Sequence, residues 1–285
     1  HLKASGKESW GKLEEVIHRL ERAREAGVAI TADVYPYHAS STGLNFDFPS
    51  WLMEGGHEAF VRRLRDPEAR RRVLAETELI PPEDILLVSF KNTDLRHLTG
   101  KTLAEVATER GVHPVEAAMD LMAADDSRIG TVRFTMSEEN VRRKIALPWV
   151  SFCSDSGSLA PEPPFTHSQP HPRAYGSFAR VLGKYAREEG LIPLEEAIRR
   201  LTGFPAENLR LDRRGLLAAG YFADVVVFDP ATITDHATFE EPHQLATGVH
   251  HVFVNGVRVV RDGAHTGALP GRVVRGPGWT GTPAP

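Results

Sequence analysis

Four short segments carry side chains whose types and spacing could perform hydrolytic chemistry, and the first of them ends in Asp155. The segment WVSFCSD (149–155) predicts a short buried strand that ends in this carboxylate. In an α/β barrel, polar residues at the carboxyl ends of strands face the active-site mouth. A carboxylate there could ligate a metal ion and accept a proton from metal-bound water. The alternative is that Asp155 only caps the following turn.

Cys153 and Ser154 adjoin this carboxylate but lack the motifs of a nucleophile. Strand alternation places Cys153 on the same side as Asp155, yet no second Cys or His completes a known motif around it. We interpret Cys153 as a small core residue. Ser154 does not lie in a G-x-S-x-G turn, which argues against a serine hydrolase.

The second and third segments add a metal-ligand type, a cation and a phenol. His1 and Lys3 are two residues apart, so at a strand end both would point to one side. This pairing suits one metal ligand and one anion-binding cation, unless His1 is a terminal residue without a role. In DVYPY (33–37), Asp33 and Tyr35 share a face. A tyrosine hydroxyl there can orient a carbonyl or tetrahedral oxygen, with aromatic packing as the alternative.

The fourth segment is a loop that contains His167, His171 and Arg173 among prolines and serines. The planar guanidinium of Arg173 could clamp a carboxylate. The two histidines are four residues apart, but the prolines exclude helical ligand spacing. The alternative for all three is that they are solvated loop residues.

The elements that must position these groups alternate between helices and strands. The apolar spacing predicts an amphipathic helix over residues 8–26, followed at once by a β-branched strand over 28–35 that Pro36 ends. Helix followed by strand is the repeating unit of α/β proteins. After the strand at 149–155, further helices are expected at 176–190, 193–203 and 204–210.

Residues 38–147 are too long for one connection between barrel elements, so we expect an inserted lid or cap region. Within it, Thr102 and Glu105 have the spacing of a helix capping box, and Ser137 could cap a helix over 138–147. Helices are also expected at 57–64, 67–79 and 113–124, and strands at 84–90 and 131–136.

From about residue 214 the pattern changes to short β-branched runs between turn residues. The runs at 223–230, 250–263 and 271–276 predict a small β unit over 214–275. Asn255-Gly256 fits a tight hairpin turn with positive φ at both residues. The Gly/Pro-rich residues 276–285 are expected to form a mobile tail. The partial barrel then spans 1–213, including the lid.

Composition excludes several classes of protein. The 285 residues carry 34 Lys and Arg against 38 Asp and Glu, a net charge of −4, which gives no electrostatic footprint for nucleic acid or a membrane surface. No apolar stretch approaches the ~18 residues of a transmembrane helix. A single cysteine excludes an internal disulfide and favours a cytoplasmic protein.

In order along the chain, these segments resemble the D-aminoacylase (N-acyl-D-amino-acid deacylase) family of the amidohydrolase superfamily. The matching block from 171 to about 242 is long and specific. The shorter matching stretches are HLKASGKESWGK, DVYPYHASST, FCSDSG and VFVNGVRVVRDGAHTGALPGR. The resemblance implies the C-terminal part of a metal-dependent (β/α)₈ TIM-type barrel with an inserted lid, plus part of a small β-sandwich.

The resemblance also implies roles for five residues. The zinc-ligating histidine of the family's S-H-x-K motif falls on His1, and its substrate-binding lysine on Lys3. The first tyrosine of Y-P-Y falls on Tyr35, which would hydrogen-bond the scissile carbonyl or oxyanion. The S-D-G/S aspartate falls on Asp155, the expected general base, then acid, and a metal ligand. The arginine of H-P-R falls on Arg173, a partner for the substrate carboxylate.

The implied activity is zinc-dependent hydrolysis of N-acyl-D-amino acids, with one or two zinc ions and a small-molecule substrate. The family's His-x-His, bridging Cys and further His are missing from this sequence, so we expect a fragment that is inactive and poorly metallated alone. Two alternatives stay open. One is hydrolysis of cyclic amides or ureides, as by dihydropyrimidinase, and the other is a non-catalytic binding or assembly module.

Overall fold

Two parallel strands, β1 (Ala32–Val34) and β5 (Val150–Phe152), form the part of the fold that carries the predicted site. The computed structural model describes residues 1–281. Asp33 pairs with Ser151 in the parallel ladder. Both strands are shorter than the sequence predicts, because only three residues of each meet a partner in register. The predicted strands over 28–35 and 149–155 therefore continue as irregular chain on both sides.

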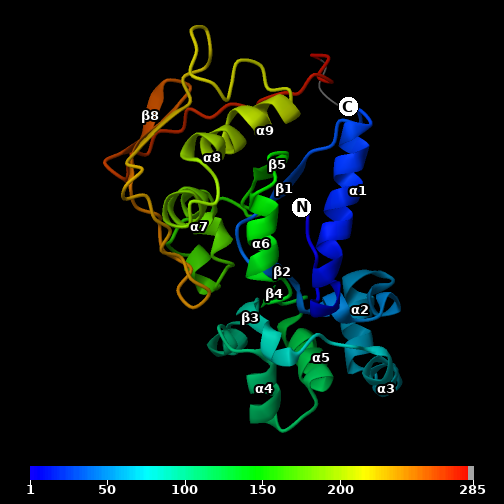
Figure 1. The fold of residues 1–285 in the computed structure, drawn as a ribbon. Coiled ribbons are helices and arrows are strands. Elements are labelled where there is room, and N and C mark those ends of the chain that lie inside the picture. The colour runs from blue at the N-terminus through cyan, green and yellow to red at the C-terminus, as the bar shows by residue number, and fades with distance from the viewer. Residues whose placement is uncertain (282–285) are drawn as a thin grey trace.

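Helices cover this strand pair and share one hydrophobic core with it (Figure 1). The predicted helix over 8–26 begins as a 3₁₀ turn, η1, and continues as α1, whose Leu13 and Ile17 are buried. These side chains pack in one cluster with Val150 and with Ile145. The helices are η1 (Lys7–Lys12), α1 (Leu13–Glu25), α6 (Glu138–Ile145), α7 (Arg173–Arg180), α8 (Leu194–Leu201) and α9 (Gly203–Asn208).

The helix predicted over 176–190 differs from the expectation in both its start and its type. It begins three residues earlier as α7 and continues as a π-helix, η7 (Val181–Glu188). Gly183 lies on η7, where a Cβ atom would stand 2.6 Å from the carbonyl oxygen of Ile233. Glycine at this position therefore lets the backbone around Ile233 approach the helix.

The lid has a sheet and a core of its own at the lower end of Figure 1. Its antiparallel sheet has the order β2-β4-β3. The capping box of Thr102 and Glu105 is confirmed at the start of α4. Strand β2 was not predicted, because SSTG has no apolar alternation. The lid elements are β2 (Ser40–Gly43), η2 (Leu44–Asp47), η3 (Ser50–Met53), α2 (Gly56–Arg65), α3 (Pro67–Glu76), η4 (Pro82–Asp84), β3 (Ile85–Ser89), η5 (Thr93–Leu98), α4 (Leu103–Arg110), α5 (Pro114–Asp125) and β4 (Gly130–Arg133).

The two ends of the lid meet at its base. The backbone N–H of Met136 donates to the carbonyl of His38 at 3.1 Å. Ser137 caps α6 as predicted, accepting from the N–H of Asn140. Beyond this point Val141 and Ile145 join the core around β1 and β5 rather than the lid core. The lid core itself spans residues 44–129.

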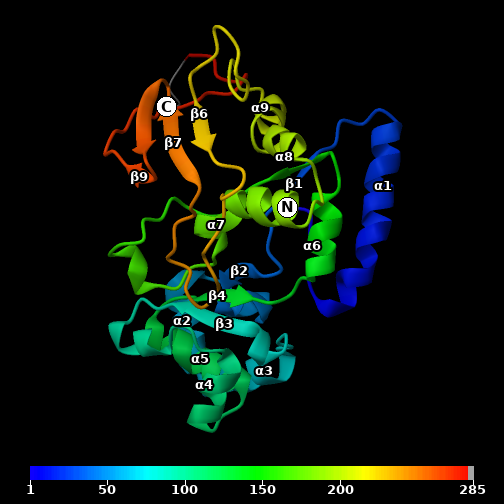
Figure 2. The same ribbon diagram turned by 60° about the vertical axis from the view of Figure 1, so that its left-hand side comes forward.

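The C-terminal part forms one antiparallel sheet of order β6-β7-β8-β9, seen at the upper left of Figure 2. Its strands are β6 (Val225–Phe228), β7 (Val249–Val254), β8 (Val257–Arg261) and β9 (Ala264–His265). The predicted hairpin is confirmed, with φ of 49° at Asn255 and 81° at Gly256. The strand expected at 271–276 is wrong, because these residues pair with no strand in the described chain.

The tail and the lengths of the helices were also subjects of prediction. The last four residues of the tail predicted over 276–285 lie outside the described residues. Among residues 1–281, no helix is both long enough and apolar enough to cross a membrane.

Candidate metal centre and hydrolytic site

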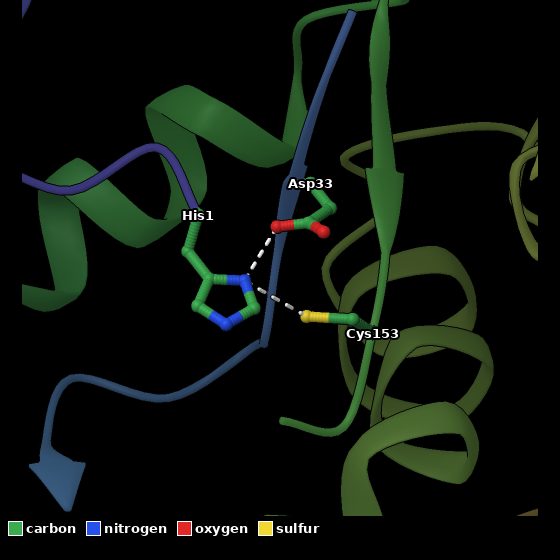
Figure 3. A group of neighbouring side chains, drawn as sticks. All are labelled: His1, Asp33 and Cys153. Atoms are coloured by element: carbon green, nitrogen blue, oxygen red, sulfur yellow. Dashed lines mark hydrogen bonds and ion pairs between the residues drawn. The ribbon is translucent and has the colours of Figure 1, made fainter. Parts of the chain in front are cut away.

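The imidazole of His1 lies at the centre of a cluster formed by segments far apart in the sequence (Figure 3). Its Nδ1 lies 2.5 Å from Oδ1 of Asp33 and 3.4 Å from Sγ of Cys153. Its Nε2 lies 3.1 Å from Oδ1 of Asp155. The ligand atoms of His1, Asp33 and Cys153 are all within 4.8 Å of one another. One ring thus joins the start of the chain to the middle of β1 and to the segment that follows β5.

Asp155 follows β5 after two residues and has a left-handed backbone, with φ of 49°. Such a conformation costs about 1 kcal/mol for a residue with a Cβ, and it is concentrated at functional sites. Oδ2 of Asp155 forms an ion pair with Nη1 of Arg173 at 2.8 Å, which leaves Oδ1 toward His1. No backbone N–H within residues 1–281 donates to this carboxylate, so the turn-cap alternative for Asp155 is wrong.

Tyr35 is buried beneath the cluster, and its hydroxyl makes no hydrogen bond of good geometry in the described chain. Two cations flank its ring: Nζ of Lys3 lies 4.7 Å and Cζ of Arg173 4.5 Å from the ring centroid. Burial raises the pKa of the Tyr35 phenol to about 12. The phenol therefore stays protonated over the physiological range and is available as a donor.

The backbone next to Tyr35 is fixed by hydrogen bonds from side chains of α7 and η7. The carbonyl of Pro36 accepts from Nε of Arg180 at 3.0 Å and from the hydroxyl of Tyr185 at 3.4 Å. Tyr185 also donates to Glu138 at the start of α6. The sharp Tyr-Pro-Tyr segment is thus fixed by α6, α7 and η7, and Tyr35 is placed with it.

His171 is buried at 4% exposure, so the interpretation of it as a solvated loop residue is wrong. Its Nε2 donates to the carbonyl of Ala39 at 3.0 Å, and its Nδ1 accepts from the backbone N–H of Arg173 at 3.1 Å. Burial, followed by the charge of Arg173, lowers the pKa of His171 to about 3. A neutral imidazole therefore fixes the start of α7, from which Arg173 reaches Asp155 and Tyr35.

The two predicted cations differ in exposure. Arg173 is buried, whereas Lys3 is exposed at the mouth of the cluster. Partial burial lowers the pKa of Lys3, and the carboxylate of Asp155 opposes this shift. The pair therefore offers one buried guanidinium and one exposed ammonium, both close to the ring of Tyr35.

His167, in contrast, lies away from the cluster. It lines a surface cavity of about 540 Å³ together with Arg96, Gln169 and His243. The structure thus brings together His1, Lys3, Tyr35, Asp155 and Arg173, and it leaves out His167.

Sequence reasoning missed the contributions of Asp33 and Cys153 to the site. The interpretation of Cys153 as a small core residue is incomplete, because its thiol is partly buried against Tyr35 but also contacts His1. Burial raises the pKa of this thiol to about 12. Alternation did place Asp33 on the face of Tyr35 and Cys153 on the face of Asp155. What the sequence lacked was the parallel register that brings the two strands together.

His1 and Asp155 fit a zinc ion. Zinc is bound in proteins by imidazole nitrogen and carboxylate oxygen, and Nε2 of His1 lies 3.1 Å from Oδ1 of Asp155. The site also stands at the carboxyl ends of parallel strands, where α/β proteins place their chemistry. Fold and site together define an α/β protein with a candidate metal-binding site beside a pair of parallel strands.

Comparison with known proteins identifies the family of this chain. Residues 86–260, more than half of the chain, match the amidohydrolase family. The chain therefore belongs to the amidohydrolase family.

Relatives that match nearly the whole chain include a D-aminoacylase and two N-acyl-D-amino-acid deacylases. The chain is 37% identical to D-aminoacylase and 35% identical to N-acyl-D-glutamate deacylase, both of Alcaligenes xylosoxydans xylosoxydans, over 96% of its length. It spans 47% of each relative, about half of their length. The resemblance found in the sequence is thereby confirmed.

Solved structures agree with these sequence relatives. A D-aminoacylase structure with a binuclear metal centre matches 95% of this chain and 48% of that chain, with a TM-score of 0.72 and 34% identity. An N-acyl-D-glutamate deacylase of Bordetella bronchiseptica, complexed with zinc and a phosphonate inhibitor, matches 90% of this chain and 44% of that chain, with a TM-score of 0.68 and 32% identity. The predicted α/β fold of the amidohydrolase barrel superfamily is confirmed.

Proposed function

We propose that the protein containing this chain is a zinc-dependent hydrolase of the amide bond in N-acyl-D-amino acids. The observation that carries the proposal is that side chains from separate segments meet around the rings of His1 and Tyr35, which contact each other. Asp155 contacts the imidazole of His1, and Lys3 and Arg173 both lie against the phenol of Tyr35. Arg173 also pairs with Asp155. These are the group types that amide hydrolysis needs: a metal ligand, a proton acceptor, an oxyanion donor and carboxylate-binding cations. Relatives named as D-amino-acid deacylases support the same chemistry.

His1 and Asp155 would hold the zinc ion on this chain. When bound, zinc supplies a water of lowered pKa and polarises the scissile carbonyl. Asp155 takes the proton of the attacking water, and the ion pair of its Oδ2 with Nη1 of Arg173 keeps the carboxylate oriented for this step. As the C–N bond breaks, the same carboxyl delivers this proton to the leaving nitrogen.

Tyr35 acts at the carbonyl oxygen of the substrate. Its hydroxyl is protonated and makes no good hydrogen bond to another side chain within residues 1–281, so it is free to donate as that oxygen gains charge. A donor fixed in advance and shielded from water stabilises the developing oxyanion without reorganisation. Arg180 and Tyr185 donate hydrogen bonds to the carbonyl of Pro36, the next residue, and this restrains the position of the phenol during the step.

Lys3 and Arg173 would bind the carboxylate of the amino acid. The guanidinium of Arg173 can turn one edge to the substrate while Nη1 stays on Asp155. Lys3, exposed at the mouth, adds a second charge. Because both cations face Tyr35, a linear substrate would be held by its carboxylate with its amide over the phenol.

We further propose a cytoplasmic setting and a small-molecule partner. The single cysteine and the net charge of −4 support this assignment, with no nucleic acid or membrane partner. The names of the relatives favour a linear N-acyl amino acid over a cyclic amide.

The test compares hydrolysis of N-acetyl-D- and N-acetyl-L-amino acids by the complete gene product, with and without zinc. We expect zinc-dependent release of the D-amino acid. Arg173→Gln and Lys3→Gln should raise KM at least about tenfold with a smaller change in kcat, because they remove ground-state binding. Arg213→Gln, a matched change at an exposed arginine that follows α9, should alter neither. Equal rates on both enantiomers would exclude the stereochemical part, and no zinc-dependent hydrolysis would exclude the enzyme.

A further inference from the structure

The two ring nitrogens of His1 face two different carboxylates. Nδ1 meets Oδ1 of Asp33 at 2.5 Å, and Nε2 meets Oδ1 of Asp155 at 3.1 Å. Asp33 is held at its backbone as well, because its carbonyl accepts from the N–H of Leu2 at 2.9 Å. The segment that carries His1 is therefore tied to β1 through both main chain and side chain.

The distances decide which carboxylate can share an ion with His1. Zinc binds nitrogen and carboxylate oxygen at about 2.0–2.2 Å, so two such ligands at a tetrahedral angle stand about 3.4 Å apart. The 3.1 Å between Nε2 and Asp155 is close to that separation. The 2.5 Å between Nδ1 and Asp33 is almost 1 Å too short for it and is much nearer to the length of a hydrogen bond to a charged acceptor, about 2.7–2.9 Å.

We propose that Asp33 is a positioning residue that accepts a hydrogen bond from Nδ1–H of His1 and thereby directs Nε2 toward the metal ion. The inference rests on the proposed function in that His1 is taken as a metal ligand. A carboxylate on the far nitrogen of a ligating histidine fixes its tautomer and ring orientation and raises its basicity. Asp33 would touch neither the ion nor the substrate.

Cys153 makes possible a second arrangement, in which a metal ion binds to Nδ1 of His1 instead of Nε2. Its sulfur lies 3.4 Å from Nδ1, on the side of Asp33, so these three groups could bind a soft metal through Nδ1 (Figure 3). A ring nitrogen cannot both carry a proton to Asp33 and coordinate a metal. The two arrangements are therefore mutually exclusive, and substitutions at Asp33 and Cys153 separate them.

The experiment measures zinc affinity of the complete gene product by competition with a chelator. Asp33→Asn keeps the shape of the acceptor and removes its charge, and we expect it to weaken zinc binding about 10- to 100-fold. Cys153→Ser should leave the affinity within about twofold, and Asp212→Asn, at an exposed aspartate, serves as the control. In the cobalt-substituted protein, Cys153→Ser should leave the thiolate-to-metal absorption unchanged from that of the wild type.

Two results would overturn the inference. One is an Asp33→Asn variant with wild-type zinc affinity. The other is a cobalt–thiolate band that Cys153→Ser abolishes together with tight binding, which would place the ion at Nδ1.

A measurement without metal separates this inference from the proposed function. In the metal-free protein at alkaline pH, ¹⁵N NMR should find the Nδ1–H tautomer of His1, and Asp33→Asn should reduce its population. A wild type that binds no zinc would exclude the proposed metal chemistry. The tautomer would still decide the role of Asp33: an Nε2–H ring in the wild type would refute it.

Discussion

The buried imidazole of His171 should make the protein lose stability as the pH falls below about 6.5. In the native state burial holds the pKa of His171 at about 3, whereas in the unfolded chain it returns to the ordinary value of about 6.5. Between these values the unfolded chain binds a proton that the native chain does not. The stabilisation is therefore complete above pH 6.5 and is lost as the pH falls through this window.

The magnitude follows from the two pKa values of His171. From pH 8 to pH 5, protonation of the unfolded chain lowers the free energy of unfolding by about 2 kcal/mol, with a ceiling of about 5 kcal/mol near pH 3. Any native pKa below about 4 gives nearly the same loss at pH 5. The result therefore depends on the burial of the ring and little on the precise shift.

The assay is urea unfolding of the metal-free protein between pH 8 and pH 5, for the wild type and His171→Gln. Glutamine can donate to the carbonyl of Ala39 and accept from the N–H of Arg173, but it does not titrate. The wild type should lose about 2 kcal/mol more than the variant over this range, since other titrating groups cancel in the comparison. Parallel curves, or an NMR titration of His171 near 6.5, would refute the reasoning.

Three shorter predictions concern other residues. Tyr35→Phe should lower kcat about 10²- to 10³-fold in steady-state kinetics with KM nearly unchanged and no loss of stability, because the hydroxyl makes no good hydrogen bond in the described chain. Thr102→Ala should cost about 1 kcal/mol and speed hydrogen exchange at the start of α4, whereas an unchanged rate would contradict the capping role. Gly183→Ala should destabilise the protein by about 1–3 kcal/mol in urea unfolding, because its Cβ would stand 2.6 Å from the carbonyl oxygen of Ile233.

Elements with strong local rules were predictable from the sequence. The capping box at Thr102, the Ser137 cap and the Asn255-Gly256 hairpin depend on residues within four positions of one another. Elements defined by distant partners were not. Strand β2 exists because β4 lies beside it, and 271–276 forms no strand because none lies beside it in the described chain.

In the candidate site, too, some residues could be predicted from the sequence and others could not. Polar residues at predicted strand ends, together with the family resemblance, led to His1, Tyr35, Asp155 and Arg173. The burial of His171 could not be predicted, because its Pro- and Ser-rich surroundings are typical of exposed loops. Only the fold shows that Ala39 and the start of α7 enclose its ring.

The closure of the lid at its base has a consequence for the order of folding. Its core lies within residues 44–129, and the bond from Met136 to His38 joins its two ends. The lid can therefore collapse during synthesis before the chain beyond it has left the ribosome. The pairing of β1 with β5 must wait for residue 152, and by then the folded lid has shortened the effective loop between them. The inserted region thus lowers the entropic barrier to assembling the site.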